Sequence, residues 1–343
     1  MENRQQAKQY DYLQESEEIV MPIVEKSSYK TPVFFWNAHL QTIYPSYARK
    51  LEKVNYEREI FTAPDKMKFY LDWSKTGSDK LVIVSHGLCG NTNRHYVLST
   101  VKTFNGVGWD VLAWNYRGTG PTPLEDASSM TTSNSTDHLA WVLEHAILSG
   151  HYKKVVLMGF SMGGDLNLMY LSREASSVPN EMLGSVSFCA TIDVNASSRC
   201  FDSFMGNVYF KYFIKKLKKI VIDADKATPG SVKNMDRLEG VSNILEYDDL
   251  FMAPLAGFRN AEDYWTTTSA WRWLDRLQVP SLIVNPKNDP FLAGKCYPVE
   301  EARQNDALFL EMPDGGGHCG FFNYGDVEWW PMRRAKEFVG GLK

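Results

Sequence analysis

The chain has 343 residues, 44% of them apolar, and a formal net charge of −4 at pH 7. This length fits one large α/β domain with an insertion, or two domains, and the apolar content predicts a substantial core. The mildly acidic balance excludes the basic surface that nucleic-acid binding requires, so we expect no nucleic-acid partner.

The N-terminus and the cysteines indicate the compartment. Met1–Glu18 is polar and lacks the apolar core of a secretory signal peptide, so we expect a loose arm or a surface helix there. No stretch approaches the roughly 18 apolar residues that span a membrane. The five cysteines are odd in number, and their spacing fits neither a disulfide framework nor a zinc site. We therefore expect reduced thiols and a cytoplasmic protein.

An aromatic stretch, Phe34–Pro45, follows the N-terminal region and contains His39. We interpret it as a segment that packs over the sheet, with His39 held by a hydrogen bond. The expected boundaries are an N-terminal arm over residues 1–30 and one α/β domain over residues 31–343.

From Tyr56 onwards, strand and helix patterns follow one another. Rough alternation over Tyr56–Thr62 and Lys68–Trp73 predicts a hairpin that turns near Pro64. Continuous apolar runs such as Leu81–Ser85 predict strands buried on both faces. The alternation predicts a mainly parallel sheet with helices on both faces, and a site at the carboxyl ends of its strands. The other expected strands are 109–114, 155–160, 185–190, 281–285 and 307–311, and the expected helices are 94–104, 136–148, 165–172 and 329–339.

The alternation breaks between about Asp193 and Trp271, where helical pieces occur without a clear strand. We expect a helical cap insertion at about 193–272. Within it, Tyr209–Val221 combines helically spaced apolar residues with five lysines. The favoured interpretation is a lid helix that packs its apolar face inward. The alternative is a helix that lies on a membrane surface.

The sequence Gly159-Phe160-Ser161-Met162-Gly163 lies between an apolar run and a helical run. In this context a G-x-S-x-G pattern predicts a sharp strand-to-helix turn that exposes the serine, and the flanking glycines remove side chains that would clash there. Ser161 is therefore the candidate nucleophile. The alternative is a glycine-rich turn that only lets the helix pack closely on the sheet.

A nucleophilic serine needs a base, and the base needs an orienting acid. His318 and Asp289 are the candidates, because each follows an expected strand at the same edge of the sheet as Ser161. Asp193 also follows a strand and competes with Asp289 for the role of acid. Asp314 is a weaker competitor, since it lies in the same loop as His318.

The backbone N–H groups of Met162 and Leu88 are the candidate donors to a developing oxyanion. Leu88 follows His86-Gly87 in the loop after the strand Leu81–Ser85. We expect His86 to brace that loop. His318 beside Cys319 could belong to a metal site, but no ligand spacing supports one.

These motifs together resemble the α/β-hydrolase superfamily. The matching motifs are His86-Gly87-x-x-Gly90, Asn115-Tyr116-Arg117-Gly118, Gly159–Gly163, Asn288-Asp289-Pro290 and Gly317-His318-x-Gly320. Two further stretches are similar to its YheT-like branch, and the resemblance covers about residues 30–340. These stretches are His39–Pro45 and Ala253–Phe258 with Asp263-Tyr264.

The resemblance implies an α/β-hydrolase fold with an eight-stranded sheet and a Ser161, Asp289 and His318 triad. It implies hydrolysis of carboxylic esters with short or medium acyl chains, some of them lipids, and no cofactor. Two loops depart from the branch, where Thr119-Gly120 replaces Cys-Ser-Gly and Ser133-Asn134-Ser135 replaces His-Ser-Gly or His-Ala-Gly. We expect both loops to lie near the mouth of the pocket. We therefore do not assign the substrate preference of the branch to this chain.

The predicted function is that of a serine hydrolase that cleaves small-molecule carboxylic esters through an acyl-enzyme. An acyltransferase with the same triad, and a ligand-binding protein that has lost the chemistry, remain as alternatives. Contact with a membrane surface, the acyl chain length and the oligomeric state are left open.

Overall fold

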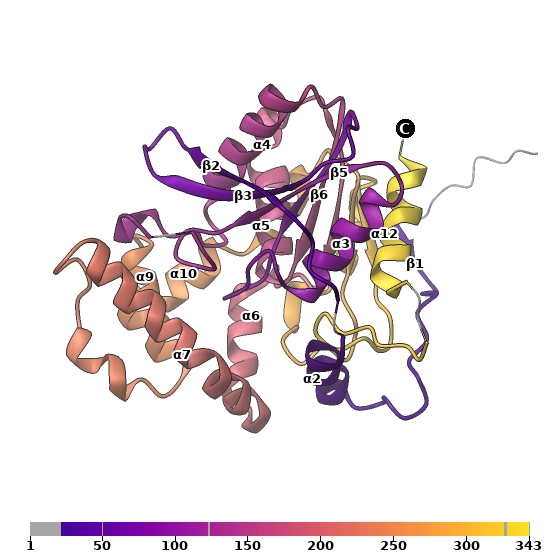
Figure 1. Ribbon diagram of the computed structural model, residues 1–343. Helices are drawn as coiled ribbons and strands as arrows, with labels where there is room; N and C mark the ends of the chain where they lie inside the picture. The colour runs from indigo at the N-terminus through magenta and orange to yellow at the C-terminus, as the bar shows by residue number, and fades with distance from the viewer. Residues whose placement is uncertain (1–21, 50, 123, 326–327, 343) are drawn as a thin grey trace, which may run out of the picture.

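One mixed sheet of nine strands forms the centre of the molecule (Figure 1). The computed structural model describes residues 22–49, 51–122, 124–325 and 328–342, so the polar lead Met1–Glu18 lies outside the described residues. The strand order is β1-β9-β8-β7-β6-β4-β5-β3-β2. The strands are β1 (Ile23–Val24), β2 (Glu57–Thr62), β3 (Lys68–Ser74), β4 (Lys80–Ser85), β5 (Asp110–Asn115), β6 (Lys154–Phe160), β7 (Met182–Phe188), β8 (Ser281–Val284) and β9 (Leu308–Glu311).

The pairing confirms the expected mainly parallel sheet. β2 and β3 form the predicted antiparallel hairpin, and β3 pairs antiparallel with β5. All other neighbours are parallel. The residues of β5 and β8 are all buried, and in β4 and β6 only the first residue is not. This two-sided burial is why these strands are continuous apolar runs in the sequence.

The sheet has nine strands, so the expected number of eight is wrong. The additional strand, β1, pairs in parallel with β9 through Ile23 and Val24, and the Leu310 N–H donates to the Pro22 carbonyl at 2.7 Å. These residues lie in the range that we expected as an N-terminal arm. Two residues after a proline are too few to give a strand period, so the pattern could not reveal this strand.

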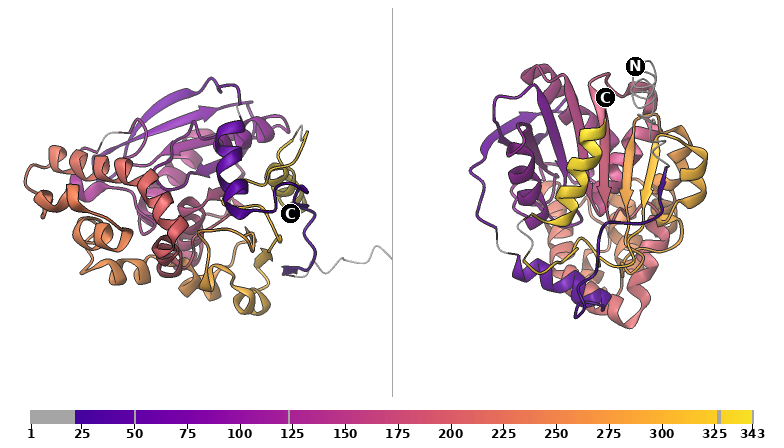
Figure 2. Two further views of the ribbon diagram at one scale, coloured as in Figure 1. Left: turned by 90° about the horizontal axis from the view of Figure 1, so that it is seen from below. Right: turned by 90° about the vertical axis from the view of Figure 1, so that its right-hand side faces the viewer.

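Helices cover both faces of the sheet, as predicted. Helices α3 and α12 lie together on one face, and α4 and α5 cover the other (Figure 2). These helices are α3 (His95–Asn105), α4 (Thr136–Gly150), α5 (Met162–Arg173) and α12 (Trp330–Gly341). Two further helices are α2 (Ala38–Ala48) and α11 (Val299–Gln304), which precedes β9.

The segment between β7 and β8 is fully described and contains helices but no strand, as expected (Figure 1). Its apolar residues form a second cluster, which includes Phe210, Val221, Phe251 and Trp265. Its helices are α6 (Val194–Arg199), α7 (Phe204–Ala227), α8 (Ile244–Tyr247), α9 (Ala253–Leu255) and α10 (Ala261–Thr267), with a π-helical turn at Asp248–Met252 and 3-10 turns at Cys200–Asp202, Met235–Gly240 and Ala270–Arg276.

Helix α7 contains the basic amphipathic stretch. Its buried side chains include Phe210, Leu217, Ile220 and Val221, so the expected inward packing of the apolar face is confirmed. No helix in the described part of the chain is long and apolar enough to cross a membrane.

Helix α5 approaches the sheet closely, because glycines occupy the contact. A Cβ atom on Gly159 would lie 2.5 Å from the Cα of Gly164. A Cβ atom on Gly164 would lie 2.9 Å from that of Ala190 and 3.1 Å from that of Ser187. Helix and sheet therefore meet backbone to backbone, with no room for a methyl group.

We expect Gly159→Ala to lower the free energy of unfolding by about 1–3 kcal/mol, because the new methyl group would overlap the backbone of α5. Urea denaturation gives this value. The matched control is Gly340→Ala in α12, where nothing lies within 4 Å of the new Cβ. There, the gain in helix propensity should raise stability by about 0.5–1 kcal/mol. Equal unfolding midpoints for Gly159→Ala and the wild type would contradict the backbone contact.

Candidate active site

Ser161 occupies a strained turn between β6 and α5. Its backbone angles are φ 56° and ψ −126°, a combination that residues with a side chain rarely adopt. The Ser161 N–H donates to the Phe188 carbonyl at 2.9 Å, and the Ser161 carbonyl accepts from Gly164 at 2.9 Å. These bonds hold the turn, so the side chain projects from the carboxyl edge of the sheet.

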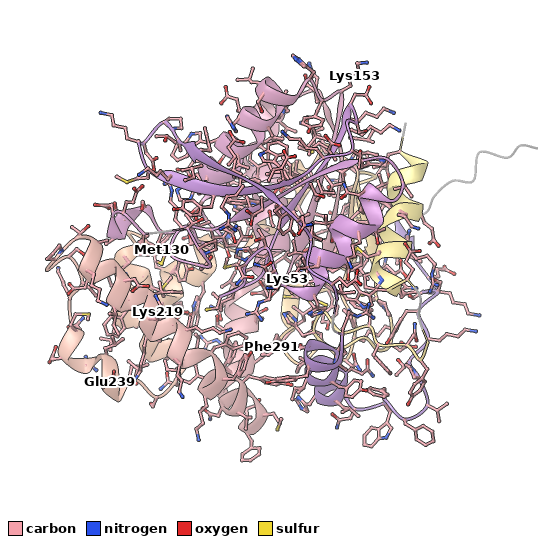
Figure 3. All side chains as sticks on the ribbon, in the orientation of Figure 1. Lys53, Met130, Lys153, Lys219, Glu239 and Phe291 are labelled. Atoms are coloured by element: carbon pink, nitrogen blue, oxygen red, sulfur yellow. The ribbon has the colours of Figure 1, made fainter. Side chains whose placement is uncertain are left out.

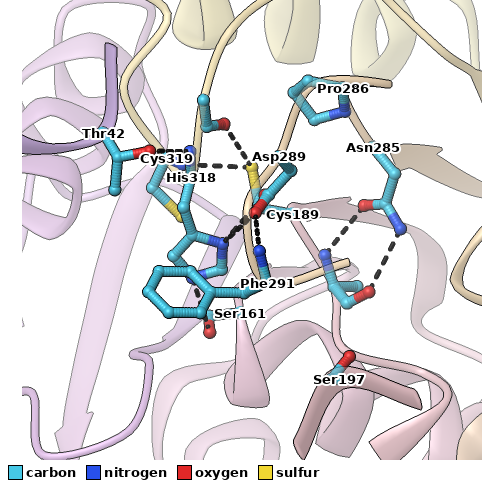
Figure 4. Close-up of polar contacts among 12 residues, drawn as sticks. Thr42, Ser161, Cys189, Ser197, Asn285, Pro286, Asp289, Phe291, His318 and Cys319 are labelled. Atoms are coloured by element: carbon cyan, nitrogen blue, oxygen red, sulfur yellow. Dashed lines mark hydrogen bonds and ion pairs between the residues drawn. The ribbon is translucent and has the colours of Figure 1, made fainter. Parts of the chain in front are cut away.

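Three side chains form a hydrogen-bonded row at this edge (Figure 4). His318 Nε2 lies 2.9 Å from Ser161 Oγ, and His318 Nδ1 lies 2.8 Å from Asp289 Oδ2. The three residues come from the loops after β6, β8 and β9, as the sequence predicts. The structure therefore brings together all three residues of the predicted triad.

The environment of the row controls its charge. The Asp289 side chain is fully buried, and its Oδ1 accepts the N–H of Phe291 at 2.9 Å. Burial lowers the pKa of His318, but the Asp289 carboxylate and Cys319 together raise it more, so this pKa lies at about 9. A buried anion beside the imidazole stabilises its protonated form.

Helix α2 holds the loop that carries His318. The His318 N–H donates to Thr42 Oγ1 at 2.9 Å, and the Gly316 N–H donates to Gln41 Oε1. We expected the aromatic stretch Phe34–Pro45 to pack over the sheet. This expectation is wrong, because α2 packs on the Gly315–Gly320 loop instead. His39 is hydrogen-bonded as expected, with its Nδ1 3.0 Å from the Tyr209 hydroxyl.

Sequence reasoning missed the role of Thr42 and Gln41, although both lie in the His39–Pro45 motif that carried part of the resemblance. It also missed Cys189, whose Sγ accepts the Cys319 N–H at 3.1 Å. No local pattern connects residues that are more than a hundred positions apart. The His39–Pro45 motif was the only signal in the sequence for these supporting residues, and it covered α2 but not Cys189.

The competing acids have other roles. Asp193 caps α6, where its carboxylate accepts the N–H groups of Ala196 and Lys295 at 3.0 Å each. Asp314 is 90% exposed and pairs with Lys287 at 2.7 Å. Within the described residues, neither of these two carboxylates contacts His318. The geometry therefore favours Asp289 as the acid that orients His318.

His86 braces its loop, as expected. Its Nδ1 lies 2.9 Å from the Gly87 carbonyl oxygen, and its own carbonyl accepts the Tyr116 hydroxyl at 2.7 Å. Burial lowers the pKa of His86 to about 4, which keeps the imidazole neutral at physiological pH. The braced loop continues into Leu88.

Leu88 and Met162, the candidate oxyanion donors, line one cavity together with Ser161 and His318. Met162 is the first residue of α5, and the first N–H groups of a helix have no carbonyl partner within it. The positive end of the helix dipole also points to this position. The arrangement could therefore stabilise a negative charge that develops beside Ser161 Oγ.

A metal site is the alternative use of His318. Its ring lies near the thiols of Cys189 and Cys319, and the three possible ligand atoms are within 4.8 Å of one another. However, both ring nitrogens already lie within hydrogen-bond distance of Asp289 and Ser161. A metal on His318 would break one of these contacts, so the cluster fits a proton relay better than a metal centre.

Two cavities meet at Ser161 and His318. The inner cavity, of about 150 Å³, extends beneath the helices of the 193–272 insertion. The outer cavity, of about 710 Å³, lies between α2, α3 and α7. Leu88, Phe213 and Phe291 line both. The two loops that depart from the YheT-like branch contribute Thr119 and Ser133 to the inner cavity.

The chain is similar to known proteins in both sequence and structure. A family model described as "alpha/beta hydrolase fold" matches residues 80–323. The chain is 28% identical over 292 residues to "Putative esterase YheT" of Escherichia coli, covering 84% of this chain and 85% of that protein. It is 25% identical over 310 residues to "Phospholipase ABHD3" of Mus musculus, covering 88% of this chain and 74% of that protein.

A solved structure, the Pyrococcus furiosus esterase PF2001, shares the fold. The TM-score is 0.58 at 19% sequence identity, and the match covers 84% of this chain and 91% of that chain.

The pKa of His318 predicts how the reactivity of Ser161 depends on pH. His318 accepts the Ser161 proton only when its Nε2 is unprotonated, so the rate of labelling by a fluorophosphonate should rise with pH through a midpoint at about 9. Asp289→Asn removes the negative charge, so the midpoint should move to lower pH while the maximal rate falls by up to about 10⁴-fold. Stopped labelling reactions between about pH 5 and 11 would measure the midpoint and the maximal rate, because these limits bracket the ordinary histidine pKa of about 6.5 and the raised pKa of about 9. An unchanged midpoint in Asp289→Asn would contradict the assigned charge pair.

Proposed function

The chain belongs to the alpha/beta hydrolase fold family, and from this premise we propose that it is a serine hydrolase that cleaves carboxylic esters. The observation that carries the proposal is the row in which Ser161 Oγ is 2.9 Å from His318 Nε2, and His318 Nδ1 is 2.8 Å from Asp289 Oδ2. The names of the relatives, an esterase and a phospholipase, support the same class of reaction.

The first half of the proposed reaction forms an acyl-enzyme. His318 Nε2 removes the proton from Ser161 Oγ while this oxygen attacks the ester carbonyl carbon. The carbonyl oxygen becomes an oxyanion that accepts the Leu88 and Met162 N–H groups. The intermediate then collapses, the bond to the alcohol oxygen breaks, and His318 gives its proton to the leaving alcohol. Asp289 fixes the imidazole tautomer and stabilises the cation that forms.

The second half hydrolyses the acyl-enzyme. His318 Nε2 removes a proton from a water molecule, whose oxygen attacks the acyl carbon. The second oxyanion uses the same N–H groups. The bond to Ser161 Oγ then breaks, His318 returns the proton to this oxygen, and a carboxylic acid leaves.

The two cavities suggest where each part of the ester binds. The inner cavity is lined by apolar side chains of the 193–272 insertion, such as Phe213, Leu217, Ile220 and Ile244, and suits a short or medium acyl chain. In this proposal the insertion is a cap over the site. The outer cavity is larger and contains Asn93 and Arg94, so it suits the alcohol part of the substrate.

We expect Ser161→Ala to abolish labelling by a fluorophosphonate probe and to lower the turnover of p-nitrophenyl esters by about 10⁴-fold or more, because the nucleophile is removed. Labelling is read from a fluorescent gel, and turnover from p-nitrophenol release. Folding should be unaffected, since Ala lacks only the hydroxyl group.

Ser197→Ala is the matched control, because Ser197 also lines the inner cavity but bonds to Cys296 Sγ at 3.3 Å and not to His318. It should keep both labelling and turnover. Wild-type turnover in purified Ser161→Ala would refute the assigned nucleophile. A wild-type protein that is folded but neither labelled nor active would favour a binding protein without chemistry.

The inner cavity predicts a limit on acyl chain length. Turnover should rise along a series of p-nitrophenyl esters, beginning with acetate, and fall once the chain exceeds the cavity. Leu217→Ala removes three carbon atoms from the wall, so the preferred chain should lengthen by about two to three methylene groups.

Leu245→Ala, at a residue of α8 that is 47% exposed and does not line the inner cavity, is the control and should leave the preference unchanged. Thermal unfolding should accompany the assay, because truncating a buried leucine costs about 2–5 kcal/mol. An unchanged preference in a folded Leu217→Ala protein would place the acyl chain elsewhere.

A further inference from the structure

The surface around the outer cavity is unusually apolar. Residues 31–48 contain no Asp, Glu, Lys or Arg. Within this segment Phe34 and Trp36 are each 77% exposed, and Tyr47 is 68% exposed. Large apolar side chains that gather on one exposed face usually mark a site of interaction.

Helix α7 continues this apolar surface. Its Phe204 is 83% exposed, and Val208 and Tyr212 follow it at intervals of four residues. α2 lies beside the N-terminal part of α7 (Figures 1 and 2), and the two helices are joined by the hydrogen bond between His39 and Tyr209. We name residues 33–47 and the outward side of α7 from Phe204 to Lys215 the docking face.

Lysines share the outward side of α7 with the apolar residues. At roughly 100° per residue, Lys211 and Lys215 fall within about 40° of Phe204 on the helix circumference. Neither lysine forms an ion pair with any described residue. The whole helix contains six lysines and two aspartates, although the chain is acidic overall. Apolar side chains flanked by unpaired lysines are typical of helices that lie in a lipid interface.

The docking face surrounds an opening to Ser161. Ile43 and Tyr47 of α2, with Val208 and Tyr212 of α7, are exposed and also line the outer cavity, which extends to Ser161 and His318. Figure 3 shows Phe291, a residue that lines both cavities, between the 193–272 insertion and α2. A lipid that leaves a bilayer at this face could reach Ser161 without crossing water.

We propose that the docking face binds an anionic lipid surface, with its aromatic side chains in the interface and Lys211 and Lys215 on the phosphate groups. Charge complementarity favours this partner over a second copy of the chain. A two-fold contact between copies would bring both sets of lysines into one interface, in which the docking face supplies no Asp or Glu to pair with them. A negatively charged bilayer attracts them instead.

Flotation with vesicles tests this binding directly and needs no turnover. Vesicles of phosphatidylcholine alone would be compared with vesicles that contain phosphatidylglycerol at roughly a 7:3 ratio, which supplies the negative surface potential. The wild type should bind the anionic vesicles more strongly, and less so at high salt. The Phe34→Ser/Trp36→Ser variant should bind about tenfold or more weakly, because two interfacial aromatic groups are lost. Lys211→Glu/Lys215→Glu should bind the anionic vesicles about tenfold or more weakly.

Leu148→Ser and Lys153→Glu are the matched controls. Leu148 is 74% exposed at the end of α4, and Figure 3 shows Lys153 at the opposite end of the molecule from α2. Both controls should bind like the wild type. The docking variants should keep their thermal stability and their turnover of p-nitrophenyl acetate, since none of the changed residues lines either cavity.

Three results would overturn the proposal. The first is no binding to either kind of vesicle. The second is binding that depends on the lysines but not on Phe34 and Trp36, which would indicate adsorption by charge alone. The third is a dimer in solution that Phe34→Ser/Trp36→Ser converts to a monomer, which would assign the face to a second copy.

Discussion

The left-handed backbone of Ser161 is the constraint on which the site depends. A φ of 56° on a residue with a side chain costs about 1–3 kcal/mol and persists only where its surroundings hold it. Here the surroundings are the hydrogen bonds to Phe188 and Gly164 and the glycines that bring α5 against the sheet. The turn aims Oγ away from the sheet and places the start of α5 beside it. The position of the serine and the nearby positive helix end therefore have one structural cause.

The loop that carries His318 is a second strained element, and distant parts of the chain hold it. Gly316, Gly317, Cys319 and Phe321 all have positive φ angles. One hydrogen bond, from the Phe321 N–H to the Gly316 carbonyl at 2.7 Å, lies within the loop. Distant residues also fix it: side chains of α2, Cys189 after β7, and the Trp329 indole N–H, which donates to the Gly320 carbonyl at 2.9 Å. The position of the base thus depends on residues from both ends of the described chain. Helix α2 belongs to the site although none of its residues is in the triad.

Features set by local periodicity could be predicted from the sequence, and features set by distant contacts could not. The strands β4 to β9 and the elbow have clear local patterns, and the edge shared by Ser161, Asp289 and His318 follows from parallel pairing. The two-residue β1 has no period of its own. The sequence could not decide fully between Asp289 and Asp193, because both follow parallel strands and only the path of each loop separates them. Likewise, the helix expected over 136–148 continues to Gly150, and His151 takes the left-handed position after it.

The two interpretations of the α7 sequence, a lid helix and a helix that lies on a membrane surface, are compatible with each other. A helical period separates residues onto opposite sides, so one helix can present different surfaces to different neighbours. Phe213 and Leu217 line the inner cavity, whereas Phe204 and Lys215 lie on the exposed side. A lid over an acyl chain requires only the first surface, and contact with lipid requires only the second. If both surfaces are used as proposed, a single rigid element connects the lipid surface to the acyl site, and the outer cavity between α7 and α2 is the path between them.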